Sequence, residues 1–76
     1  MSERFFLDTN VLVYAADHNS GEKRERGREI LRRAITTGLG VVSTQVLQEY
    51  FVVATRKLRI DAAVARREVS LFAALD

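Results

Sequence analysis

The stretch that decides the fold is Phe5-Phe6-Leu7-Asp8-Thr9-Asn10-Val11-Leu12-Val13-Tyr14. Its first three residues form a continuous apolar run, as in a short strand of a parallel sheet that is covered on both faces. Thr9 and Asn10 then favour a helix start, because a short side-chain oxygen can accept a hydrogen bond from an unpaired amide of the first turn. The sequence therefore predicts a strand, then a helix to Ala16. Asp8 lies between them, where open α/β sheets place their binding groups.

The same strand-then-helix pattern recurs in the middle of the chain. Gly40-Val41-Val42-Ser43 is typical of a second short strand with β-branched residues. Ser43 or Thr44 is predicted to cap a helix over about 45–57, whose apolar residues cover one broad arc.

Two further helices are predicted, one after each of the two helices described above. The first runs to Gly38, with Asn19 or Ser20 as its cap, and places Gly27 on its buried stripe, where close packing would explain a glycine. The last follows Asp61 and covers about 62–75. The predicted order is β-α-α-β-α-α in an α/β fold, with short strands that are parallel because helices connect them.

Length and composition indicate one small domain. The chain has 76 residues and no cysteine, which excludes disulfides and suits the cytoplasm. Its longest apolar run, Val11–Ala16, is far too short for a membrane span. The net charge is only +2, but residues 22–33 and 56–67 are both rich in lysine and arginine. Such patches can hold phosphates, although solvated helix faces have the same composition.

Two carboxylates are the candidates for chemistry. Asp8 follows the first strand, and Glu49 lies about two turns into the helix after the second. If the strands are neighbours, both side chains reach the same edge of the sheet, where they could hold Mg²⁺ or Mn²⁺. Asp8 could instead serve only to start a helix, and Glu49 could be an ordinary solvated helix residue.

The two motifs together resemble the PIN domain, and within it the VapC toxins of toxin–antitoxin operons. The resemblance lies in Phe6 to Leu12 and in Val42 to Tyr50. It implies a Rossmann-like, three-layer α/β/α fold and a metal-dependent endoribonuclease specific for single-stranded RNA. It further implies a homodimer that is inhibited by a VapB-type antitoxin. The residues that it carries over are Asp8 and Glu49 as catalytic metal ligands and Asn10 and Ser43 as their polar supports.

The chain departs from the family pattern in its number of acids. The family has a third and a fourth acid near later strands, so the resemblance implies that residues 1–76 form a single PIN-like half-domain, truncated before those strands and acids. Neither Glu68 nor Asp76 matches the motifs of those later acids. Two acids alone should bind Mg²⁺ or Mn²⁺ weakly, and cleavage of RNA should be impaired.

Other functions are compatible with the same residues. The chain could be an inactive PIN remnant that binds RNA or an antitoxin, or mediates oligomerisation, or a structural piece without activity. An apolar strand before Asp-Thr-Asn also resembles haloacid-dehalogenase phosphatases, but Asn10 and Leu12 stand where those enzymes have an acid and a threonine. Candidate contacts to an RNA backbone are Arg56, Lys57 and Arg59.

Overall fold

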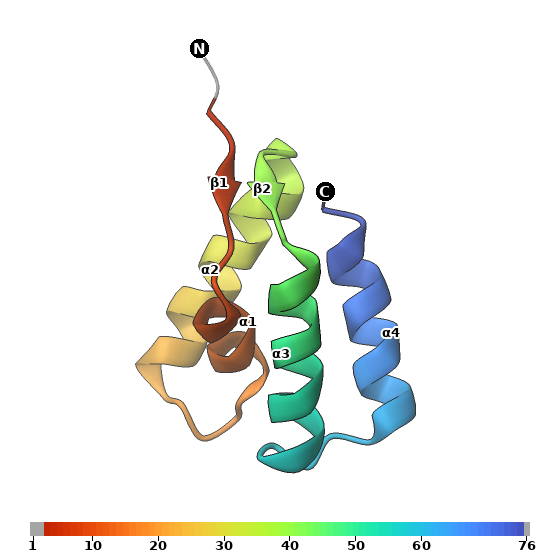
Figure 1. The fold of residues 1–76 in the computed structure, drawn as a ribbon. Coiled ribbons are helices and arrows are strands. Elements are labelled where there is room, and N and C mark those ends of the chain that lie inside the picture. The colour runs from red at the N-terminus through yellow and green to blue at the C-terminus, as the bar shows by residue number, and fades with distance from the viewer. Residues whose placement is uncertain (1–2, 76) are drawn as a thin grey trace.

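A computed structural model describes residues 3–75 as four helices and a two-stranded parallel sheet (Figure 1). This confirms the mixed α/β class and the parallel pairing. In chain order the elements are β1 (Phe5–Phe6), α1 (Thr9–Ala16), α2 (Glu22–Thr37), β2 (Gly40–Val41), α3 (Thr44–Arg56) and α4 (Ala62–Ala73).

The sheet brings the starts of α1 and α3 to one edge. Phe5 pairs with Gly40 and Phe6 with Val41, and the amide of Leu7 extends the ladder to the carbonyl of Val41 at 2.8 Å. Because the two strands run in the same direction, their carboxyl ends meet at the same edge, and the helix that follows each strand begins there (Figure 1).

The prediction that both faces of the first strand are buried was wrong for one residue. Leu7 is 3% exposed, as expected, but Phe6 is 78% exposed. Successive side chains of a strand point to opposite faces. The described residues cover only the face toward which Leu7 and the core lie, so Phe6 on the other face remains in solvent.

Side chains cap three of the four helices. Asp8 Oδ1 accepts from the amide of Asn10 at 3.0 Å, Ser43 Oγ from Val46, and Asp61 Oδ1 from Ala63. The structure thus confirms caps at Ser43 and Asp61 and makes Asp8 the N-cap of α1.

The predicted cap of α2 was wrong. Gly21 precedes this helix, with φ 58°, and no side chain caps it. The hydroxyl of Ser20 instead donates to the carbonyls of Tyr14 and Asp17, at 3.0 and 2.8 Å, and so fixes the turn between α1 and α2. The two carbonyls precede Ser20 in the chain, so its hydroxyl bonds back to the end of α1 instead of forward to α2.

The core joins α1, α3 and α4. Leu12 of α1 and Tyr50 of α3 are completely buried. The Tyr50 ring meets Phe72 of α4 edge-on, with centroids 5.3 Å apart and an interplanar angle of 80°. Aromatic pairs in this geometry contribute about 0.5–1.5 kcal/mol beyond their buried area. Tyr50 therefore fixes where α3 lies, and with it the adjacent Glu49.

Gly27 allows α1 and α2 to pack closely, as its position on the buried stripe predicted. A Cβ at this position would lie 2.9 Å from both the backbone nitrogen of Ala15 and the carbonyl oxygen of Val11. Only a residue without a side chain fits there, so α2 holds the backbone of α1 directly. No helix in the described part of the chain is long and apolar enough to cross a membrane.

Candidate functional site

An open pocket of about 1120 Å³ lies where α1, α2, α3 and α4 meet. Its floor is largely apolar, and its rim carries charges of both signs. The charged side chains that line it are Asp8, Asp17, Glu49 and Glu68 on the acidic side and Arg24, Arg28 and Lys57 on the basic side.

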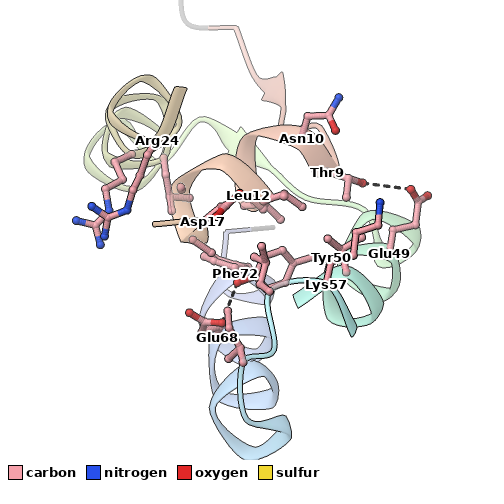
Figure 2. Close-up of a pocket in the computed structure, with 18 of the residues that line it drawn as sticks. Thr9, Asn10, Leu12, Asp17, Arg24, Glu49, Tyr50, Lys57, Glu68 and Phe72 are labelled. Atoms are coloured by element: carbon pink, nitrogen blue, oxygen red, sulfur yellow. Dashed lines mark hydrogen bonds between the residues drawn. The ribbon is translucent and has the colours of Figure 1, made fainter. Parts of the chain in front are cut away.

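Asp8 and Glu49 line this same pocket. The hydroxyl of Thr9 donates to Glu49 Oε2 at 3.3 Å, a contact between residues 40 positions apart in sequence (Figure 2). The Glu49 carboxylate is therefore anchored to the residue directly after Asp8. Both acids are exposed, so water and small ions reach them.

The donor atoms at this end of the pocket suit a hard cation. Asp8 uses Oδ1 to cap α1, and no hydrogen bond among residues 3–75 engages its Oδ2. Glu49, the Thr9 hydroxyl and the Asn10 side chain add further oxygens around the same pocket. Mg²⁺ and Mn²⁺ prefer oxygen ligands, and Mg²⁺ usually keeps several waters. The set fits such an ion, although the described residues contain no group of three or more histidine, cysteine or acidic side chains placed to hold a metal.

The residues that were predicted to support the two acids or to contact RNA fall into two groups, those that line the pocket and those that do not. Asn10 and Lys57 line the pocket with the acids. Ser43 does not line it and acts on α3 as its N-cap. Arg56 and Arg59 are exposed and lie outside the lining of this pocket. The roles assigned to all of them from the sequence stay predictions.

Sequence reasoning missed a second polar contact in the pocket. The Tyr50 hydroxyl donates to Glu68 Oε1 at 2.8 Å and joins α3 to α4 (Figure 2). Burial, and then the hydrogen bond and charge of Glu68, raise the pKa of Tyr50 above its usual range, so the hydroxyl stays protonated as a donor. The partners belong to different helices, so no periodicity in either one could have shown the pairing.

The comparison with known proteins agrees with the two motifs that were identified from the sequence. The family model described as PIN domain matches residues 5–75. No curated protein and no solved structure matches the chain.

Proposed function

Because the chain belongs to the PIN domain family, whose members are generally nucleases, we propose that it is an endoribonuclease of the VapC toxin type. Its substrate is single-stranded RNA, its cofactor Mg²⁺ or Mn²⁺, and its cleavage is impaired. The observation that carries this proposal is the hydrogen bond from Thr9 to Glu49, which ties the second acid to the residue beside the first.

The side chains have distinct roles in this proposal. Asp8 is the primary metal ligand and helps to orient the attacking water, while Glu49 holds the same ion directly or through a water. When bound, a divalent ion supplies an activated water and neutralises charge on the phosphate oxygens. Thr9 orients Glu49 through its hydroxyl. The Asn10 side chain supports the acids from the same pocket.

The charges of the pocket support the proposal that cleavage is impaired. Four carboxylates and only three lysine or arginine side chains line it. A polyanion is repelled from the end that carries Asp8 and Glu49 until a cation neutralises them. Affinity for a divalent ion depends on the number and rigidity of its ligands. With two carboxylates, RNA cleavage should need high metal concentrations.

A second function is a binding module without activity, favoured by the lack of a third acid near the pair in the described residues. Large apolar side chains also face solvent on several elements, Phe6 at 78%, Leu71 at 67% and Ile35 at 60%. Exposed apolar side chains of this size can contribute to contacts with another protein. In this proposal they pair with a second copy of the chain or with a VapB-type antitoxin.

Cleavage of a fluorescent single-stranded RNA, measured with Mn²⁺ or Mg²⁺ and with EDTA, separates the two functions. Asp8→Asn keeps a good N-cap and removes the charge. Asp61→Asn is the matched control, because Asp61 caps α4 in the same way outside the pocket. The nuclease proposal expects metal-dependent cleavage that Asp8→Asn abolishes and Asp61→Asn retains. RNA retention without cleavage at any metal concentration would favour the binding module.

A further inference from the structure

Two arginines of α2 line the pocket that contains the acids. Arg24 and Arg28 are one helical turn apart, and side chains at this spacing lie on the same helix face. The neighbouring basic residues of the helix are placed differently. Arg26 and Arg32 do not line the pocket, and Lys23 lies over the ring of Tyr14 at 5.2 Å. Of the basic residues of α2, only Arg24 and Arg28 therefore line the pocket.

The Arg24 guanidinium has an unmet hydrogen-bonding need. Its Nε is buried and finds no partner among the described residues. The nearest acid in sequence that lines the pocket, Asp17, already accepts a hydrogen bond at Oδ1 from the amide of Asn19 at 2.9 Å. Buried donors are nearly always paired, so an unpaired one calls for an explanation. Two like charges one turn apart also destabilise a helix. Neither feature helps the fold, and an anion bound between the two guanidinium groups would offset the repulsion of their charges.

Arg24 and the candidate metal ligand Glu49 stand at opposite sides of the pocket. Figure 2 shows Arg24 on the α2 side and Glu49 on the α3 side, with Leu12, Tyr50 and Phe72 between them. An extended ligand that crosses this floor would meet positive charge at one end and the candidate metal ligands at the other. A single nucleic acid strand carries a phosphate at every nucleotide and can contact both ends at once.

We propose that Arg24 and Arg28 form a phosphate-binding subsite that holds the RNA backbone a few nucleotides from the phosphate at Asp8 and Glu49. This assignment rests on the proposed nuclease function. The guanidinium fork matches phosphate oxygens, and a phosphate bound by both side chains offsets the repulsion between their charges. The subsite sets how the strand lies across the apolar floor and takes no part in the chemistry.

Binding of a fluorescent single-stranded RNA, followed by anisotropy against salt concentration, tests the subsite. All variants carry Asp8→Asn and are measured in EDTA, so the RNA stays intact. The double variant Arg24→Gln and Arg28→Gln, called the pocket pair, is compared with a control pair. The control pair is the double variant Arg26→Gln and Arg32→Gln, which removes the same charge from the same helix outside the pocket. Arg28→Gln alone is included because Arg28 is exposed and its replacement should leave the fold intact.

The pocket pair should weaken RNA binding about tenfold or more, since hydrogen bonds to charged groups are the strong ones. It should also reduce the slope of log affinity against log salt by about 0.7 for each phosphate that is no longer neutralised. Arg28→Gln alone should show part of both effects, and the control pair much less of either.

Three outcomes would overturn the subsite: an unchanged affinity for the pocket pair, an equal loss of affinity for both pairs, or competition by an acidic peptide at concentrations where unlabelled RNA does not compete. These results are independent of cleavage. Metal-dependent cleavage with no effect of the arginines refutes the subsite alone. Arginine-dependent binding without cleavage refutes the nuclease and keeps the subsite.

Discussion

Tyr50→Phe tests how the contact between α3 and α4 holds the site. The substitution keeps the buried ring and its edge contact with Phe72 and removes only the hydrogen bond to Glu68. A hydrogen bond to a charged group contributes about 1.5–3 kcal/mol. Phenylalanine has no hydroxyl to bury, so part of this free energy is regained. Glu68 is half-buried, so water can replace the donor that its carboxylate loses. We expect a net loss of about 1 kcal/mol at pH 7, or about 4–8 °C in Tm for a domain of this size.

The pH dependence of the same variant gives a second, independent readout. The pKa of Tyr50 is raised in the folded protein, so above the unfolded value of about 10 only the unfolded chain releases this proton. The contribution of Tyr50 to stability is therefore full below pH 10. It falls at higher pH by up to about 1.4 kcal/mol per pH unit. Tyr50→Phe should lack this fall.

Urea unfolding followed by circular dichroism between pH 7 and 11 measures both effects. Tyr14→Phe controls for removal of a phenol from a tyrosine that is not completely buried. A double-mutant cycle with Glu68→Gln should show a coupling of at least about 0.5 kcal/mol, as for residues that touch each other. The reasoning is refuted if Tyr50→Phe is as stable as the wild type at pH 7 and has the same slope above pH 10.

Three further substitutions separate packing, capping and metal binding. Gly27→Ala gains about 1 kcal/mol in helix propensity but overpacks two backbone atoms of α1 at a cost of about 1–3 kcal/mol. Urea unfolding should therefore show a net loss of stability, and a more stable variant would contradict the close packing of α1 and α2. Thr9→Val keeps the side-chain shape and removes the hydroxyl that donates to Glu49. The affinity for Mn²⁺, measured by calorimetry, should fall about tenfold. The control Thr36→Val, which lies outside the pocket, should leave that affinity unchanged. Ser43→Ala should lower the unfolding free energy by about 1 kcal/mol because the α3 cap is removed, and should leave Mn²⁺ affinity within error; a large fall in affinity would instead give Ser43 a direct role at the metal.

Local chemistry made much of the fold predictable. The caps at Ser43 and Asp61 and the close approach at Gly27 each depend on a residue type whose conformational preference is strong within a few positions. The failures depended on contacts outside the helix or strand concerned. The Ser20 hydroxyl was expected to cap α2 and bonds to Tyr14 and Asp17 instead. Phe6 was expected to be buried, but the described residues place nothing over its face of the sheet.

The candidate site was predictable only in part, for the same reason. Asp8 and Glu49 could be proposed because each follows a strand, and parallel strands end at one edge. The hydroxyl of Thr9 that links them was not predicted, because its partner is 40 positions away. Glu68 matches no family motif, and its bond to Tyr50 depends on how α4 packs. The basic character of α2 was visible in the sequence, but only the packing selects Arg24 and Arg28 for the pocket.

Titration with Mn²⁺, followed by the electron paramagnetic resonance of the free ion, tests most directly whether Asp8 and Glu49 share one cation. The wild type and the Asp61→Asn control should each bind one weakly held ion per chain. Asp8→Asn and Glu49→Gln should each abolish that binding, although both keep the side-chain shape and Asn remains a good N-cap. If either variant bound Mn²⁺ as the wild type does, the two carboxylates would not form one site, and the proposed nuclease centre would be wrong.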